Sequence, residues 1–244
     1  PRPEQFVVLT ASDGGGHNGG IENIMENALT NRQEYCDAHG YICHWVDVSR
    51  FDMDGAHPVW KKLPAIIETF QTYPDVQWVW MLDLDAIIMS PEIDIVQQLL
   101  SHSGMQQQLK KDQQIKRTPY FTPHEIDPRN IDLLMAQDHG NLNAGSFLVR
   151  RSEFSQWLLD MWTDPVFIKK ADFGGAEQDA IIHFARSHPT VRKHLGIVPL
   201  RSIQSWLVSG EEMGWHKGDL VVHFAGCWVK NHCVQNWNKM WAQK

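Results

Sequence analysis

The stretch VWMLDLDAIIMSPE, residues 79–92, places two acids, Asp83 and Asp85, inside an otherwise apolar run. Removing a carboxylate from water is costly unless the group is paired or bound to a metal. On an extended backbone, residues two apart point the same way, so we expect both carboxylates to converge while Leu84 faces the core. Paired oxygen ligands suit Mg²⁺ or Mn²⁺, which can bridge the phosphates of a nucleotide. The alternative is that the acids cap the following turn.

The segments around this stretch predict an α/β fold. Apolar runs at residues 6–11, 41–48 and 76–84 predict strands, and helical spacing connects them at residues 21–39 and 57–74, with a proline break inside the second helix. Strands that alternate with helices are typical of a parallel sheet with crossover helices. Open sheets of this kind bind ligands at the carboxyl ends of their strands, which is where the two acids fall.

Composition limits the class of protein. The 244 residues suffice for a large core, and we expect one catalytic domain over residues 1–244. The net charge of −7 argues against a nucleic-acid partner. No window approaches twenty consecutive apolar residues, so we expect no membrane contact from this segment itself. The chain opens on Pro1 and has no signal peptide, so we expect a membrane anchor and a stem upstream of it.

The four cysteines allow either disulfides or free thiols. Cys36, Cys43, Cys227 and Cys233 permit three connectivities, and sequence alone does not choose among them. No CxxC pattern occurs, which argues against a structural zinc site. An even number permits disulfides in an oxidising compartment, where Cys227 with Cys233 is the favoured pair. Free thiols are equally open.

The glycine-rich loop DGGGHNGG, residues 13–20, follows the first predicted strand. It matches neither the dinucleotide-binding GxGxxG fingerprint nor the phosphate-binding GxxxxGK[ST] loop. Its glycines allow backbone amides to approach a ligand closely, which favours contact with a nucleotide. A mobile surface loop is equally consistent with the pattern.

Polar residues also flank a strand predicted at residues 146–149. Asn143 and Gly145 lie in the turn that we expect before this strand, and both could reach a ligand. Ser152 is the expected N-cap of the helix that follows, since serine side chains accept hydrogen bonds from the first free amides of a helix. The turn is therefore a candidate part of the binding site.

Two further segments carry candidate site residues. Glu177, Gln178 and Asp179 open a helical run after two glycines, where acids also stabilise the helix dipole. A structural role is therefore strongly favoured for Asp179 and open for Glu177. His223 follows an apolar run, and it is either a satisfied core residue or a third metal ligand beside the two aspartates.

Taken in order, blocks of the sequence resemble glycosyltransferase family 34. These blocks are LTAS, NRQEYCDAHGY, HPVWKKLPAI, WVWMLDLDAIIM, NAGSFLVRRSEFSQWLLDMW, EQDAIIHF and VVHFAGCW, and they run from about Phe6 to Trp228. The family contains fungal Golgi α-mannosyltransferases and α-1,2-galactosyltransferases, and plant xyloglucan xylosyltransferases. Within the family, these sequence blocks look most similar to the α-1,6-mannosyltransferase subunits of fungal mannan synthesis.

The resemblance implies an α/β fold of the GT-A type, with a Rossmann-like mixed sheet flanked by helices. It also implies a nucleotide-sugar donor held by Mn²⁺, for which Asp83, Asp85 and His223 match the metal-binding positions. Glu177 and Gln178 match the pair under the donor sugar, and we take them as the catalytic residues. The donor-binding residues that we expect are Thr10, Ala11, Ser12, Lys62, Asp83, Leu84, Asn143, Gly145 and Gly226.

Two positions depart from the plant members of the family. Trp228 stands where they carry a lysine that could neutralise the leaving diphosphate, and Lys230 is a candidate substitute. Ala176 stands where they carry another acid. Both departures face the donor, which argues against UDP-xylose. Trp206 and Trp215, together with Trp228, either line an acceptor groove or pack in the core.

The function that we expect is transfer of mannose from GDP-mannose to a mannose-terminated glycan, with retention of configuration and an α-1,6 linkage. Three alternatives stay open: an α-1,2-galactosyltransferase that uses UDP-galactose, a non-catalytic lectin-like or scaffolding subunit of a mannosyltransferase complex, and a metal-dependent phosphohydrolase. Attack from the face that the diphosphate leaves is favoured over double displacement, because Gln178 is an amide. The resemblance further implies a type II membrane protein of the Golgi lumen, with other mannosyltransferase subunits as partners.

Overall fold

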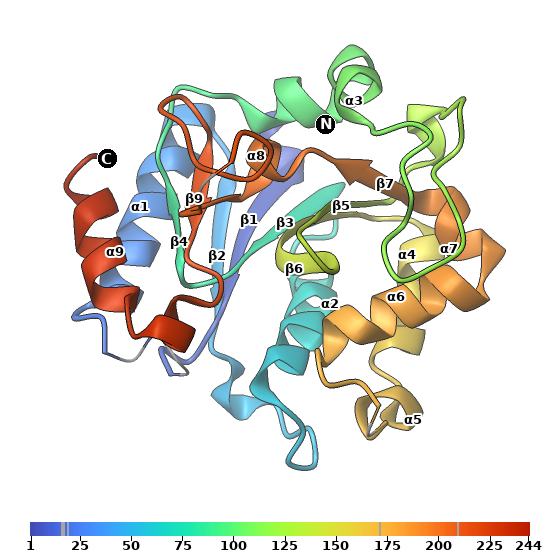
Figure 1. The fold of residues 1–244 in the computed structure, drawn as a ribbon, viewed down its shortest axis with the longest axis horizontal. Coiled ribbons are helices and arrows are strands. Elements are labelled where there is room, and N and C mark those ends of the chain that lie inside the picture. Colours follow the sequence, from blue (N-terminus) through green and yellow to red (C-terminus); the bar gives the residue numbers. More distant parts are fainter. Residues whose placement is uncertain (16–17, 19, 171, 209) are drawn as a thin grey trace.

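A computed structural model of the chain describes residues 1–15, 18, 20–170, 172–208 and 210–244, so part of the predicted glycine-rich loop lies outside the described residues. A six-stranded sheet in the order β2-β1-β3-β6-β5-β7 crosses the molecule, with helices on both faces (Figure 1). Its strands are β1 (Phe6–Ala11), β2 (Ile42–Val46), β3 (Trp78–Leu82), β5 (Leu133–Gln137), β6 (Leu142–Arg150) and β7 (Leu195–Val198).

One strand of this sheet runs against the others. β1 pairs in parallel with β2 and β3, and β5 pairs in parallel with β7. β6, in contrast, is antiparallel to both β3 and β5. The three strands predicted at the start of the chain and their parallel arrangement are therefore confirmed. The reversed β6 makes the sheet mixed, as the family resemblance implies.

Alternating residues bury both faces of the large sheet. Val7 and Leu9 of β1 face one core, whereas Phe6 and Val8 face the other. The first face is covered by α2 (Lys62–Thr72), α4 (Glu153–Trp162), α5 (Pro165–Ile168), α6 (Glu177–Ser187) and α7 (Pro189–His194). The second is covered by α1 (Ile24–His39), α3 (His102–Gln108) and α8 (Leu200–Ile203). Among the described residues, no helix combines the length and apolar composition needed to cross a membrane.

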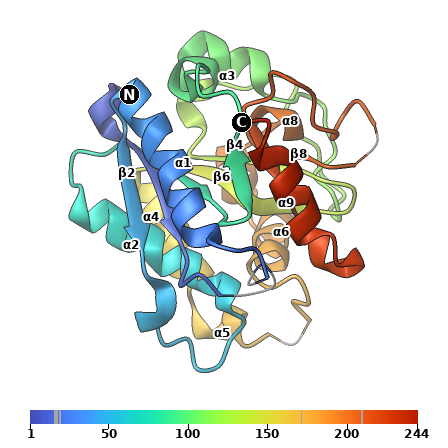
Figure 2. The same ribbon diagram turned by 90° about the vertical axis from the view of Figure 1, so that its left-hand side faces the viewer.

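A second, three-stranded sheet continues from the carboxyl end of β3. Its order is β4-β9-β8, from β4 (Ala86–Ile88), β9 (Val221–His223) and β8 (Ser205–Trp206). One apolar cluster joins this sheet to α1 and to α9 (Cys233–Trp241), and Figure 2 shows β4 between these two helices. The chain therefore passes from one sheet to the other across residues 83–85.

Helix starts follow local sequence signals. Ser152 caps α4 as predicted, since its hydroxyl accepts from Ser155 N at 3.1 Å. The predicted break at Pro64 lies earlier, between a 3₁₀ turn (Pro58–Lys61) and the start of α2. Pro64 lies in the first turn of α2, where its missing amide hydrogen leaves no bond unmade. The expectation of two helical pieces is confirmed, and the assignment of their boundary to the proline is wrong.

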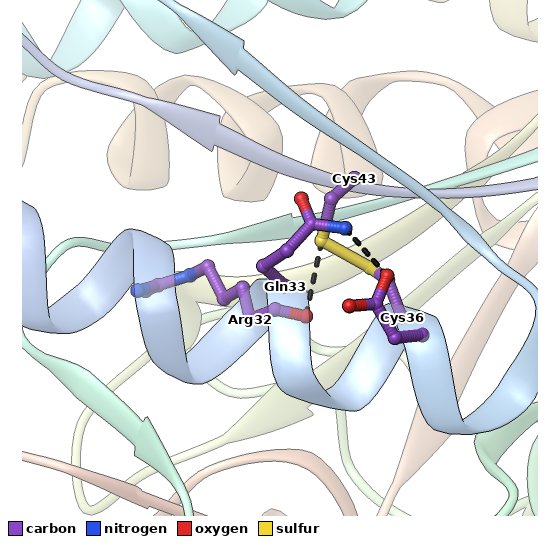
Figure 3. Close-up of a disulfide and its surroundings, with 5 residues drawn as sticks. Arg32, Gln33, Cys36 and Cys43 are labelled. Atoms are coloured by element: carbon purple, nitrogen blue, oxygen red, sulfur yellow. Dashed lines mark hydrogen bonds between the residues drawn. A yellow bond between two sulfur atoms is a disulfide. The ribbon is translucent and has the colours of Figure 1, made fainter.

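All four cysteines are paired. Cys36 of α1 bonds to Cys43 of β2, and Cys227 bonds to Cys233 at the start of α9. Figure 3 shows the first bridge beside Arg32, whose carbonyl oxygen lies 3.1 Å from Cys43 Sγ. The favoured pairing of Cys227 with Cys233 is confirmed, and the free-thiol alternative is wrong.

Candidate metal centre and binding cavity

The segment Asp83–Asp85 is a turn between the two sheets, and the prediction of an extended backbone at these residues is wrong. Asp83 is tied to the large sheet, because its backbone N donates to Gly145 O of β6 at 2.8 Å. Asp85 is tied to the small sheet, because its backbone O accepts from Phe224 N at 3.0 Å. Leu84 packs into the apolar cluster of the small sheet, as expected. The turn brings the two carboxylates together even though the backbone is not extended.

Three candidate metal ligands meet at this turn. One ligand atom from each of Asp83, Asp85 and His223 lies within 4.8 Å of the other two. His223 ends β9, where it lies opposite Ala86 of β4. The side chains of Asp85 and His223 are only 7% and 4% exposed. Two carboxylates and an imidazole suit a divalent ion such as Mn²⁺, so the residues fit the metal that the family implies.

The buried pair of Asp85 and His223 is held by attraction. Asp85 Oδ1 lies 3.4 Å from His223 Nε2. Burial by itself would raise the pKa of Asp85, but the adjacent His223 lowers it below its usual range. Burial would likewise lower the pKa of His223, and Asp85 raises it above its ordinary value. Each group therefore stabilises the charged form of the other.

The ring of His223 packs directly on β6. A side-chain carbon at Gly145 would collide with His223 Cε1, so this position requires glycine for close contact. The sequence predicted Asn143 and Gly145 in a turn, whereas both belong to β6. The strand is irregular here, because Asn143 Oδ1 accepts from Gly145 N at 2.9 Å and the register with β5 shifts beside it. That irregularity was not visible in the apolar pattern.

A buried arginine lies behind the turn. Arg32 of α1 is 1% exposed and donates from Nη2 to Asp83 O at 2.5 Å. Burial lowers the pKa of Arg32 to about 10, against the attraction of Asp83 and Asp85. Its Nε and Nη1 have no hydrogen-bond partner in the part of the chain that the structure describes. Arg32 was not predicted as a site residue, although it shares a helix face with the buried Ala28 and Tyr35.

Lys62 connects the turn to the opposite wall of the site. Its Nζ lies 2.9 Å from Asp83 Oδ1 and 3.1 Å from Glu177 Oε1, and it donates to Ala144 O at 3.0 Å. Burial would lower the pKa of Lys62, but the two carboxylates raise it well above its ordinary value. Burial raises the pKa of Glu177, and Lys62 opposes that shift. The three ammonium hydrogens thus have three protein partners, and Lys62 remains charged.

The start of α6 presents the predicted catalytic pair. Glu177 and Gln178 both line the cavity, and Gln178 Oε1 accepts from Ala144 N at 2.7 Å. Ala176, directly before them, has φ 50° and ψ −122°, a conformation that favours glycine. The strained residue lies in the cavity wall.

A cavity of about 560 Å³ lies between the Asp83–Asp85 turn, the start of α2 and the start of α6. Such a volume is typical of small-molecule sites. The predicted residues in its lining are Ala11, Ser12, Lys62, Asp83, Leu84, Asp85, Asn143, Gly145, Glu177, Gln178 and His223. The lining also includes Val48, His57, Pro58 and Val59, which the sequence did not single out, and Trp228, which is 44% exposed.

Other predicted residues lie outside this lining. Thr10 is buried within β1, and Gly226 directly precedes the 3₁₀ turn at Cys227–Lys230. Asp179 forms an ion pair with Arg117 and accepts from Gly175 N, so the structural role favoured for it is supported. Also outside are Lys230, Trp206 and Trp215.

The fold matches that of a known class of enzyme. A solved glycosyltransferase involved in the glycosylation of the major capsid of PBCV-1 superposes with a TM-score of 0.65 over 96% of this chain and 98% of that chain. The sequence identity between the two is 12%, so the likeness concerns the fold alone. The fold is that of the GT-A glycosyltransferases, as the resemblance implied.

The chain belongs to the galactosyl transferase GMA12/MNN10 family, which matches residues 2–234. The probable α-1,2-galactosyltransferase gmh1 of Schizosaccharomyces pombe is 38% identical over 98% of this chain and 74% of that protein. The uncharacterized α-1,2-galactosyltransferase C1289.13c of the same yeast is 36% identical over 98% of this chain and 66% of its own length. The probable α-1,6-mannosyltransferase MNN10 of Saccharomyces cerevisiae is 30% identical, over 98% of this chain and 64% of its own length. The chain is therefore a glycosyltransferase.

Proposed function

We propose that the protein is a retaining, Mn²⁺-dependent transferase that moves a hexose from a nucleoside-diphosphate sugar to a mannose-terminated glycan. The observation that carries this proposal is the meeting of Asp83, Asp85 and His223 in the wall of a cavity that also contains Glu177 and Gln178. One part of the wall suits a metal and phosphates, and the other suits a sugar. A lectin-like or scaffolding protein has no need of this buried ligand set.

A divalent ion bound between these ligands would stabilise the negative charge that develops on the departing diphosphate. The chain's own contacts hold its ligands in place. Asp83 is paired with Lys62, and Asp85 is paired with His223. Groups held in this way need little rearrangement when the reaction occurs, which is the main source of electrostatic catalysis.

The surroundings of Glu177 favour substitution on one face of the sugar over double displacement. Its carboxylate is 4% exposed and lies 3.1 Å from Lys62 Nζ, so attack on the anomeric carbon would break a buried ion pair. In the favoured route, the bond from the anomeric carbon to the acceptor oxygen forms as the bond to the diphosphate oxygen breaks. The acceptor proton passes to the departing oxygen. Gln178 Oε1, fixed by Ala144 N, has a second lone pair that can face the positive charge on the sugar.

For the donor we favour UDP-galactose, with GDP-mannose as the second candidate. The relatives named as α-1,2-galactosyltransferases are 38% and 36% identical to this chain, whereas the mannosyltransferase relative is 30% identical. The sequence motifs by themselves favoured GDP-mannose as the donor. The higher identity to the galactosyltransferases changes our preference to UDP-galactose. A place in the Golgi lumen, an anchor outside this chain and partner mannosyltransferase subunits belong to the same proposal. They rest on the family resemblance.

A competition between the two donors tests this proposal. UDP-galactose and GDP-mannose, each with a different isotope label, are supplied together with Mn²⁺ and an α-mannobiose acceptor. We expect an α-linked galactose in the product, identified by its label and its anomeric coupling. Incorporation of mannose alone would reverse the donor assignment, and a β-linkage would exclude retention. If neither sugar is transferred and neither nucleotide binds with Mn²⁺, the proposed function itself is wrong.

A further inference from the structure

Gln204 lies directly behind the candidate metal centre, between α8 and β8. It is completely buried, and its side-chain amide has three protein neighbours. Gln204 Oε1 lies 3.0 Å from His223 Nδ1. Gln204 Nε2 lies 3.2 Å from Ser146 O and 3.4 Å from Asn143 O. The amide therefore connects β6 of the large sheet to the imidazole of the small sheet.

These neighbours determine which way the amide points. Carbonyl oxygens only accept hydrogen bonds, so the two carbonyls of β6 must face the NH₂ group of Gln204. The reverse orientation would place Gln204 Oε1 against the two carbonyl oxygens of β6. Three buried acceptors would then lack a donor, which is unfavourable. Gln204 Oε1 must consequently face His223. An oxygen acceptor at 3.0 Å requires a hydrogen on His223 Nδ1.

The orientation of the amide also determines the tautomer of His223. With the hydrogen on Nδ1, the neutral ring carries its lone pair on Nε2. That lone pair lies on the side of Asp85, whose Oδ1 is 3.4 Å from Nε2. Two acceptors that face each other in a buried site are stable only with a cation or a proton between them. The backbone of β6, through one amide, thus directs the ring toward the cation site.

We propose that Gln204 is a positioning residue for the metal centre: it holds His223 in the Nδ1–H form, so that Nε2 is presented to a divalent cation together with Asp85. The inference rests on the metal site of the proposed function and adds a residue to it. Metal-bound histidines commonly donate their second ring hydrogen to a fixed acceptor, and loss of that acceptor typically weakens metal binding by about 10–100-fold.

Two measurements on one pair of variants test this role. Gln204→Met removes both the acceptor and the donor at similar volume. The matched control is Gln108→Met, because Gln108 Oε1 accepts from Ser202 Oγ of α8 at 2.8 Å and thus supports the same segment away from His223. The dissociation constant for Mn²⁺ is measured with UDP present. The tautomer of His223 is read from its ring ¹⁵N shifts without metal, at a pH above the raised pKa of the imidazole, where the ring is neutral. The shifts are assigned by their loss in His223→Asn.

We expect Gln204→Met to weaken Mn²⁺ binding about 10–100-fold and to remove the Nδ1–H signature, while Gln108→Met changes neither. Gln204→Glu keeps an oxygen toward Nδ1 but loses the donor to β6. It should therefore be less stable than the wild type and retain the tautomer, which separates positioning from packing and serves if the Met variant does not fold.

A Gln204 variant without an acceptor that keeps the tautomer and binds Mn²⁺ within about twofold of the wild type would overturn the inference, since outer contacts of this kind contribute more. So would loss of the tautomer in Gln204→Glu. Failure of the wild type to bind Mn²⁺ has a different meaning. It would remove the metal site of the proposed function, while the ring ¹⁵N shifts would still show whether Gln204 sets the tautomer.

Discussion

Asp83 and Asp85 are separated by one leucine, yet they belong to different parts of the molecule. Asp83 faces the large sheet, where its carboxylate pairs with Lys62 and its backbone bonds to β6. Asp85 faces the small sheet, where its carboxylate meets His223 and its backbone bonds to Phe224. The first acid is 26% exposed and the second 7%.

This difference shows how the charge of the site is divided. On the side of the large sheet, Lys62 is a permanent cation that balances Asp83 and Glu177 in part. On the side of the small sheet, the neighbour of Asp85 is an imidazole whose charge depends on a proton. The protein therefore balances Asp83 with a permanent cation and Asp85 with a group whose charge depends on a proton. The first prediction below tests this division through metal binding, and the second tests it through stability. Two further predictions concern stability elsewhere in the molecule, and the three stability effects follow in decreasing order.

The largest effect on metal binding should follow from Asp85→Asn. Among the described residues, the ion pair of Asp85 is with the imidazole of His223, whose charge depends on a proton. We therefore expect Mn²⁺ binding to weaken more than about 100-fold, beyond the range for lost outer contacts. Asp83→Asn is the matched control and should weaken binding at least about tenfold less, since Lys62 already balances that acid. Titration of Mn²⁺ with UDP present gives both values. Equal losses of Mn²⁺ affinity in Asp85→Asn and Asp83→Asn would show that the two acids do not differ in their importance for metal binding.

The next effect concerns stability on the side of the large sheet. Lys62→Met leaves Glu177 and Asp83 without their shared cation, and loss of one partner from a buried pair costs about 3–5 kcal/mol. Denaturant unfolding measures the change. The neighbouring Lys61→Met should cost less than about 0.5 kcal/mol, as surface substitutions do. Restoration of most of the loss by a second change, Glu177→Gln, would confirm that the carboxylate is the cause.

A smaller effect should appear at the far end of the small sheet. Burial would raise the pKa of Asp219, but Arg201, Ser205 and the His216 amide lower it below its ordinary value of 3.8. Its ionised form therefore stabilises the fold above pH 3.8, and this contribution is lost as the pH falls through the folded pKa. Asp219→Asn should cost about 1 kcal/mol at neutral pH, after allowance for solvent screening, and less in acid.

Unfolding free energies of the wild type and Asp219→Asn between neutral pH and pH 3 give this difference as a function of pH. Mn²⁺ affinity at neutral pH should stay unchanged, because the side chain of Asp219 contacts Arg201, Ser205 and the His216 amide rather than a metal ligand. If the difference in unfolding free energy between the wild type and Asp219→Asn grew as the pH fell, Asp219 would stabilise the fold in its protonated form, and the prediction would be wrong.

The smallest effect is a gain in stability. Ala176 has a positive φ of 50°, so Ala176→Gly should relieve strain worth about 1–3 kcal/mol, partly offset by the larger entropy of glycine in the unfolded chain. We expect a net gain of up to about 1 kcal/mol, read as a rise in melting temperature. Ala180→Gly, inside the same helix, should instead lose about 1 kcal/mol. A loss at Ala176 would mean that its methyl group matters more than its backbone.

The elements that local sequence determines were predicted well. Apolar runs located β1 and β3, because a strand buried on both faces has no polar positions. Long-range pairing was not predicted, since nothing in the periodicity of residues 86–88 indicates that β9 pairs with them. The reversal of β6 became an expectation only through the family resemblance. The direction of a strand in a sheet depends on how the chain connects it to its neighbours. The apolar pattern of a single segment carries no information about that connection.

The same limit applies to the site. Asp83, Asp85 and His223 could be predicted because their residue types are typical metal ligands. Gln204 and Arg32 could not, because their roles come from contacts with segments distant along the chain. The side-chain amide of Gln204, for example, is oriented by carbonyl oxygens of β6. The turn at Asp83–Asp85 shows a related failure, since an apolar run does not reveal where the chain leaves one sheet for another.

The pairing of β4 with β9 has a consequence for the order of folding. β4 follows β3 directly, but its partner Val221–His223 is made much later. At roughly 5–20 residues per second, a ribosome needs about 7–26 s to cover the roughly 130 residues between them. During that time the apolar β4 has no strand to pair with, and the nascent chain presents an unprotected edge. Folding of the small sheet, and with it the placement of His223 in the candidate metal centre, can therefore be completed only after β9 has been made.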